Sequence, residues 1–134
     1  MLKGMPLPQP DLDTQVFWDG CNAEKFLVPL CGSCGSTRWP PGPMCPECHS
    51  TDTDWIESTG KGSVYSWIVA AHPVDPVLVD QVPYVVAMID LAEGVRVVGN
   101  VDGCPPDEIV AGMPVELIFE QRDENTKIPN FRKA

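Results

Sequence analysis

Four of the six cysteines stand as two pairs that could bind one metal ion. Cys31 and Cys34 form one C-x-x-C pair, Cys45 and Cys48 form the other, and ten residues separate the pairs. A C-x-x-C turn places two thiolates on one side of a tight loop. Two facing turns give the tetrahedral sulfur set that zinc binds at about 2.3 Å. We therefore predict a structural metal site at these four residues, with Zn²⁺ as the cofactor; iron, which four thiolates also suit, stays open.

Disulfides and a redox-active pair are the two other interpretations of these cysteines. A reducing cytosol disfavours disulfides, and redox C-x-x-C motifs usually stand alone beside a βαβ unit. If all four ligands are protein sulfurs, no coordination position is left for a substrate. The predicted metal site is therefore a scaffold and not a catalytic centre.

The remaining reactive side chains do not form a catalytic set. His49 follows Cys48 and could replace a cysteine as ligand, but we expect it, like His72, to be an exposed loop histidine. We expect Cys21 to pack on the apolar face of a helix and Cys104 to lie in a turn. The chain holds no nucleotide-binding glycine pattern, no G-x-S-x-G and no H-E-x-x-H. We predict no catalytic residue, and the sequence identifies no cofactor-binding residue apart from the metal ligands.

Fifteen prolines and eleven glycines indicate that the elements positioning these cysteines are short. Residues 1–13 are proline-rich, which predicts an extended arm. Apolar residues at helical spacing predict a helix over 14–27, capped by Asp13 or Thr14 and weakened at Gly20. Residues 28–54 hold the four paired cysteines among prolines and glycines. They read as a loop-rich segment that burial alone cannot hold folded, so metal binding must order it.

From residue 55 onward the pattern is that of strands. A turn at Glu93-Gly94 predicts a hairpin, and residues 105–110 predict a short helical turn. The predicted strands are 64–69, 84–91, 95–101, 115–119 and 127–131. Four or five antiparallel strands in so short a segment predict a small barrel. The order of elements fits the five-stranded OB-fold, and the pattern alone also allows an SH3-like barrel.

The charge distribution disfavours nucleic acid and membrane surfaces as partners. The chain has nine Lys and Arg against 19 Asp and Glu, a net charge of −10, and residues 55–121 carry two basic and ten acidic side chains. Phosphates and anionic lipids repel such a surface. The tail holds the basic cluster, which is the available positive site for an anion: Arg122, Lys127, Arg132 and Lys133.

No apolar run approaches the roughly 18 residues of a membrane-spanning helix. The first ten residues lack the basic and apolar regions of a secretory signal, so we expect a cytoplasmic protein.

The order of the motifs resembles a known family over about residues 17–119. The residues that carry the resemblance are the Phe17-Trp18 helix, Cys31-Gly-Ser-Cys34, Arg38-Trp39-Pro40-Pro41, Cys45-Pro-Glu-Cys48, Gly60-Lys-Gly62, Pro83-Tyr84-Val-Val-Ala, Glu93-Gly94, Gly99-Asn100 and Gly112-Met113-Pro114. They are similar to the acyl-CoA-associated proteins that join a rubredoxin-like zinc ribbon to an OB-fold. The resemblance implies a mainly β fold in three parts: an N-terminal arm and helix (1–27), a zinc ribbon (28–54) and an OB-fold with a C-terminal tail (55–134).

Members of that family are typically partners of thiolase-superfamily enzymes, including thiolases and the aldolases that shorten steroid side chains, and some relatives pair with hydratases. The resemblance thus implies a non-catalytic accessory subunit in a hetero-oligomer. It would dock on an acyl-CoA aldolase or thiolase that cleaves a carbon–carbon bond in a catabolic pathway, and help form the acyl-CoA channel near the interface. The family's zinc positions fall on Cys31, Cys34, Cys45 and Cys48.

Two hypotheses from other classes compete with this one. A nucleic-acid-binding module is the alternative, because zinc ribbons and OB-folds both occur there, but it needs a basic groove. An independent thioesterase or hydratase would need a nucleophile–base pair. The helix face of Phe17, Trp18 and Phe26 and the stiff loop at Trp39 could contact a partner or cover the chain's own core.

Overall fold

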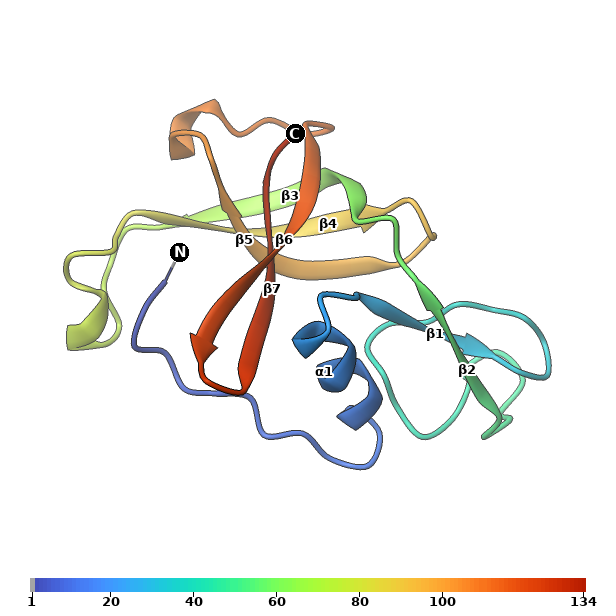
Figure 1. Ribbon diagram of the computed structural model, residues 1–134. Helices are drawn as coiled ribbons and strands as arrows, with labels where there is room; N and C mark the ends of the chain where they lie inside the picture. Colours follow the sequence, from blue (N-terminus) through green and yellow to red (C-terminus); the bar gives the residue numbers. More distant parts are fainter. Residues whose placement is uncertain (1) are drawn as a thin grey trace.

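Two sheets carry the fold of residues 2–134, the part of the chain that the computed structural model describes (Figure 1). A two-stranded sheet pairs β1 with β2, and a closed barrel follows in the order β3-β4-β5-β7-β6. The helix precedes both sheets, and two 3₁₀ turns connect barrel strands. The elements are α1 (Gln15–Asn22), β1 (Leu27–Cys31), β2 (Thr53–Glu57), β3 (Lys61–Ala70), η1 (Pro76–Leu78), β4 (Tyr84–Leu91), β5 (Arg96–Asp102), η2 (Pro106–Glu108), β6 (Pro114–Asp123) and β7 (Thr126–Lys133).

The mainly β fold, with an N-terminal helix and a five-stranded barrel, is confirmed. The expectation of a wholly antiparallel barrel is wrong at one seam, where β5 and β7 run parallel and pair only at Val101↔Phe131 and Asp102↔Arg132. A ring of five strands cannot alternate direction all the way round, because five is odd. One parallel pair is therefore the geometric consequence of closure.

The helix is shorter than predicted. It ends at Asn22, and the chain then reverses through Glu24, which has a positive φ of 59°. A Cβ on Gly20 would lie 2.9 Å from the Lys25 carbonyl oxygen. Glycine at this position therefore lets the segment after the helix fold back against it. Thr14 occupies the N-cap but makes no side-chain capping bond; its amide donates to Asp11 Oδ1 at 2.9 Å instead.

The segment over 28–54 is less loop-rich than predicted, because its ends form the β1–β2 ladder. Cys31 lies opposite Thr53 in this ladder, and Pro29 lies opposite Trp55. The Pro29 in β1 and the scarcity of apolar alternation around it hide this sheet from pattern reading. The ladder brings the first cysteine knuckle to a fixed place on a sheet.

The ribbon and the barrel are joined through the β4–β5 turn. Glu93 in this turn accepts hydrogen bonds from the Thr59 amide at 3.2 Å and from the Ser58 hydroxyl, both in the linker between β2 and β3. Its carbonyl accepts from Thr37 Oγ1 in the ribbon at 3.4 Å. One turn thus fixes the linker and the ribbon against the barrel, and buried Phe17 and Phe26 join the barrel core from the other side.

A buried polar network crosses the parallel seam. Glu120 on β6 is 2% exposed, and its Oε2 accepts from Asn130 Nδ2 at 3.1 Å. Asn130 Oδ1 in turn accepts from the Asn100 amide at 2.8 Å, and Asn100 Nδ2 donates to the Val85 carbonyl at 3.0 Å. Among residues 2–134, Glu120 Oε1 has no hydrogen-bond partner. Burial raises the pKa of Glu120, and the Asn130 hydrogen bond and the charge of Arg122, whose Nη2 lies 3.8 Å from Glu120 Oε2, oppose this only in part.

We predict that Glu120→Gln stabilises the protein at pH 8, by about 1 kcal/mol, because it keeps an acceptor for Asn130 and removes the buried charge. The raised pKa favours the protonated acid in the folded state. The cost of the carboxylate is therefore absent below the unfolded-state pKa and appears as the pH rises through the folded-state pKa. Thermal melts of variant and parent at pH 8 and pH 4 measure this. Glu124→Gln in the exposed β6–β7 turn is the control, and a destabilised Glu120→Gln at pH 8 contradicts the prediction.

Candidate functional site

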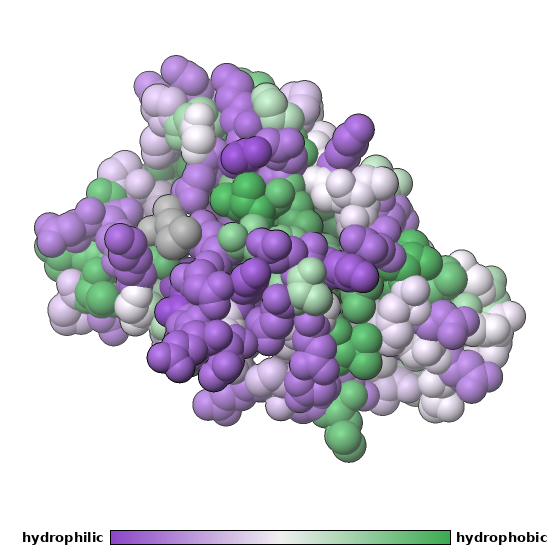
Figure 2. Space-filling model, in the orientation of Figure 1, coloured by the Kyte–Doolittle hydropathy of each residue, from purple (hydrophilic) through white to green (hydrophobic). Residues whose placement is uncertain are grey.

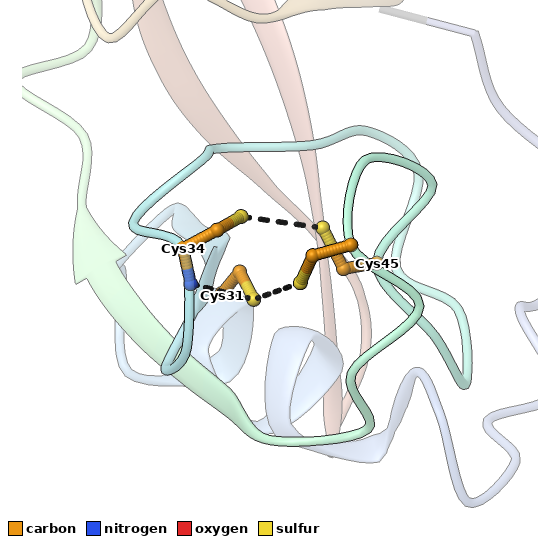
Figure 3. Close-up of side chains that lie close together, drawn as sticks. Cys31, Cys34 and Cys45 are labelled. Carbon is orange, nitrogen blue, oxygen red and sulfur yellow. Dashed lines mark hydrogen bonds between the residues drawn. The ribbon is translucent and has the colours of Figure 1, made fainter.

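The structure brings the four predicted cysteines together into one cluster (Figure 3). Their sulfur atoms all lie within 4.8 Å of one another. Cys31 Sγ is 3.5 Å from Cys48 Sγ, and Cys34 Sγ is 3.7 Å from Cys45 Sγ. A disulfide needs about 2.05 Å, whereas a tetrahedral ion with sulfur ligands at about 2.3 Å sets the sulfurs about 3.8 Å apart. The four residues therefore fit a tetrahedral metal ion and do not form disulfides.

The two knuckles have the same backbone geometry. In the first, the Cys31 amide donates to the Ser36 carbonyl at 2.8 Å; in the second, the Cys45 amide donates to the Ser50 carbonyl at 2.9 Å. Gly35 and His49 occupy matching places, with positive φ values of 75° and 63°. His49 thus serves the second turn through its backbone. Its side chain is exposed and lies outside the sulfur cluster, as expected from the sequence.

Hydrogen bonds lower the pKa of some of these thiols, whereas the neighbouring sulfurs raise the pKa of others. The pKa of Cys34 is lowered to about 6, first by the Ser36 hydroxyl and then by the Ser36 amide. The Ser50 amide also favours the Cys48 thiolate, but Cys31 and the other nearby sulfurs outweigh it and raise the Cys48 pKa to about 12. The thiolate, and not the thiol, is the metal ligand, so each protonated thiol must ionise when an ion binds. Metal binding must therefore release protons.

The other reactive residues stay apart from this cluster. Cys21 is fully buried in the core, and burial raises its pKa to about 12, so it is an inert packing residue. Cys104 is half-buried in a bend after β5, and His72 is exposed in the loop after β3. The structure places no nucleophile beside a base among these residues.

The basic tail is not the free positive site that the sequence suggested. Arg132 Nε lies 2.6 Å from Glu116 Oε1 on the neighbouring strand, and the other three cations each have a carboxylate within 4 Å. These pairs are Arg122 with Glu120, Lys127 with Glu24 and Lys133 with Glu108. Three of these acids are distant in sequence from their cations, and Glu120 is two residues from Arg122, so each tail cation already has an acidic neighbour.

An aromatic cluster joins the helix to the ribbon. Phe17 is central to it, with ring centroids 5.0 Å from Trp18, 5.1 Å from Phe26 and 5.0 Å from Trp39. Phe17 and Phe26 are buried. The sequence left open whether these rings contact a partner or cover the chain's own core. Phe17 and Phe26 cover the core, and Trp39 is partly buried against it.

The sequence pattern did not predict a groove of about 450 Å³ beside this cluster. It is lined by Leu2 and Met5 of the arm, by Trp18 and Trp39, and by residues of β5 and β7. Among residues 2–134, no lysine or arginine lines it. The spacing of residues in the arm could have indicated that it packs against the barrel. Its inward residues Leu2, Met5 and Pro8 stand three apart, the period of an extended proline-rich segment.

The outer face of β3–β5 exposes large apolar side chains. Met88 and Val98 lie opposite each other on β4 and β5, and Ile68 on β3 faces the same side. We call Ile68, Met88 and Val98 the barrel face. The neighbouring loop between β3 and β4 exposes Val74, Val77 and Val79, and Figure 2 shows hydrophobic atoms along this loop at the left edge. Exposed apolar surface of this kind marks contact sites for other molecules.

No helix within residues 2–134 is long and apolar enough to span a bilayer.

Two family models match consecutive parts of the chain. Residues 18–54 match the ChsH2 rubredoxin-like zinc ribbon domain, and residues 55–120 match the ChsH2 C-terminal OB-fold domain. The second match decides for the OB-fold over an SH3-like barrel.

Solved structures give the same picture. A chain of the "Ltp2-ChsH2(DUF35) aldolase" superposes with a TM-score of 0.87 at 41% identity, over 95% of this chain and 98% of that one. A DUF35 protein of unknown function from Sulfolobus solfataricus shares the fold, with a TM-score of 0.66 at 14% identity over 92% of this chain and 86% of its own.

Among curated proteins, the "Probable enoyl-CoA hydratase alpha subunit" of Thermomonospora curvata is 41% identical over 96% of this chain, and the "3-oxo-4,17-pregnadiene-20-carboxyl-CoA hydratase alpha subunit" of Mycobacterium tuberculosis is 35% identical over 86%. This chain spans only 40% and 36% of their lengths. A "DUF35 domain-containing scaffold protein" of Methanocaldococcus jannaschii is 36% identical over 71% of this chain and 67% of its own length. The chain therefore belongs to the ChsH2/DUF35 family, the family that its motif order resembled.

Proposed function

We propose that the chain is a non-catalytic accessory subunit that docks on a thiolase-superfamily acyl-CoA enzyme, an aldolase or a thiolase. One observation carries this proposal: the chain matches, almost end to end, the DUF35 chain of a solved aldolase complex at 41% identity. The scaffold name of the archaeal relative agrees with a supporting role. A hydratase is the second candidate partner, because two hydratase alpha subunits contain a region similar to this chain.

The reactive side chains of this chain support a non-catalytic role. Its cysteine cluster offers four sulfurs to one ion, so no position is left for a substrate. Cys21 is buried, and both histidines are exposed in loops. Carbon–carbon bond cleavage therefore belongs to the partner, and the division of labour fits a cytoplasmic complex in which thiols stay reduced.

Zn²⁺ is the ion we propose at Cys31, Cys34, Cys45 and Cys48. When bound, it supplies a rigid cross-link and no reaction chemistry. The cysteines hold the two knuckles together, and the β1–β2 ladder transmits that rigidity to the linker and to Glu93. Iron would suit the same four thiolates.

The barrel face is the surface we propose for docking. Ile68 and Val98 are 64% and 63% exposed on strands whose opposite sides form the core. Rigid strand side chains lose little conformational entropy on binding. An acidic chain with an apolar face fits a partner whose apolar patch has a basic rim.

The groove beside the arm is the part of the acyl-CoA channel that this chain would supply. Its apolar and aromatic lining suits an acyl group, and none of its lining residues within 2–134 is a lysine or arginine that could bind phosphates. Because the tail cations are already paired with acids, the partner must bind the CoA phosphates.

We predict about one divalent metal ion per chain in the parent protein and near none in Cys45→Ser, because a buried ligand is lost. Cys104→Ser is the matched control and retains the metal. Elemental mass spectrometry measures the content, and metal affinity should fall as the pH falls because thiolates become protonated. A folded, metal-free parent protein contradicts the site.

We predict that Ile68→Glu weakens binding to a thiolase-like aldolase partner at least about tenfold, because it buries a charge in the barrel face. Ile68 is chosen because Val98 also lines the groove. Val110→Glu is the control, since Val110 is similarly exposed (56%) but lies in the loop before β6. Isothermal titration calorimetry measures both affinities. Equal binding by the two variants would refute the barrel face, and binding of the parent only to a hydratase would favour the second candidate.

We predict that a long-chain or polycyclic acyl-CoA changes the tryptophan fluorescence of the complex, whereas CoA alone does not. Trp18 and Trp39 line the groove, so Trp39→Phe should reduce the signal and Trp67→Phe on β3 should not. A response to CoA alone would argue against an acyl site.

A further inference from the structure

Arg38 is a buried cation without an acidic partner. It is the single Lys or Arg in residues 28–54, a segment that also contains Glu47, Asp52 and Asp54. Those three carboxylates are exposed, whereas Arg38 is only 7% exposed. Among residues 2–134, no carboxylate oxygen lies within 4.0 Å of its guanidinium. In a chain with a net charge of −10, an unpaired buried cation needs a physical reason.

The backbone places Arg38 beside the strand that carries Cys31. Thr37 bridges to Leu30, and the Arg38 amide donates to the Pro29 carbonyl at 3.1 Å, so Arg38 lies opposite Pro29 on the free edge of β1. Residues two apart on a strand share a face, and so do residues opposite each other. Arg38, Cys31 and Thr53 therefore occupy the same face of this small sheet.

The guanidinium crosses that face. Its Nη2 donates to Thr53 Oγ1 at 2.7 Å and to the Gly42 carbonyl at 3.2 Å. Thr53 lies opposite Cys31 in the β1–β2 ladder. Nε and Nη1 are buried and make no hydrogen bond within the described part of the chain. Neutral acceptors thus hold the guanidinium at Thr53, the residue opposite Cys31, and they do not compensate its charge.

We propose that Arg38 is the counter-charge of the metal centre. Four thiolates around a divalent ion carry a formal charge of −2, and a buried cation on the same face as Cys31 lowers the energy of that arrangement. This inference rests on the metal site proposed above. Arg38 acts as a positioning residue through its charge, and it is not itself a ligand.

Two substitutions separate charge from packing. Arg38→Met removes the charge and keeps much of the side-chain volume, whereas Arg38→Lys keeps a cation. Zinc affinity, measured by competition with a chromophoric chelator on the full chain, should fall at least about tenfold in Arg38→Met and less than about threefold in Arg38→Lys. Arg96→Met is the control, because Arg96 pairs with Asp90 on the barrel.

A second readout responds to charge and not to packing. In the iron-loaded chain, loss of a nearby positive charge favours the ferric form, which has one negative charge fewer. The reduction potential of Arg38→Met should therefore fall below that of the parent, and Arg96→Met should leave it unchanged. If Arg38→Met does not fold, Thr53→Val, which removes the acceptor positioning the guanidinium, should lower the potential in the same direction.

The outcomes are distinguishable. A parent chain that binds neither zinc nor iron removes the proposed metal site itself. A parent that binds metal, with Arg38→Met equal to it in affinity and potential, overturns the role of Arg38 alone. Unchanged metal properties with lost partner binding would also overturn the counter-charge role and would assign Arg38 to the docking surface instead.

Discussion

Repulsion between four closely spaced sulfurs is the constraint on which this structure depends. Cys31 and Cys48 lie 3.5 Å apart, and the neighbouring sulfurs raise the pKa of Cys48. A divalent ion converts that repulsion into attraction. The ribbon has few buried side chains, and two of them are the cysteines Cys31 and Cys45. The metal proposed at the cluster would therefore contribute to the folding of this segment.

Barrel closure is the second constraint, and it explains where the groove lies. Five strands in a ring force one parallel seam, and β5 and β7 pair at only two positions there. Gly99 permits the close approach of Phe131, since a Cβ would lie 3.0 Å from that ring. The diverging strands leave an apolar floor that the arm and the aromatic cluster turn into a groove. The position of the groove is thus a consequence of topology.

The sequence predicted what local pattern encodes. The strand over 84–91 was predicted to the residue, because its consecutive side chains are mostly apolar and include β-branched residues typical of strands. The cysteine cluster was predicted because the spacing of its residues is also a local feature of the sequence. The β1–β2 ladder was missed because Pro29 interrupts the pattern, and the helix was drawn too long because Phe26 fits helical spacing although it belongs to the turn. The ion pairs of Lys127, Arg132 and Lys133 and the Arg38–Thr53 hydrogen bond join residues distant in sequence, so local pattern could not predict them. The domain boundaries at 27/28 and 54/55 and the cytoplasmic location stay predictions.

Native mass spectrometry of the assembled complex tests the central claim most directly. The metal-free chain, prepared with a chelator, is mixed with the thiolase-like aldolase and titrated with Zn²⁺. If a metal-braced ribbon supports a docking barrel, the complex appears in step with the addition of about one zinc ion per chain. A metal-free chain that is folded and joins the enzyme equally well would contradict the account.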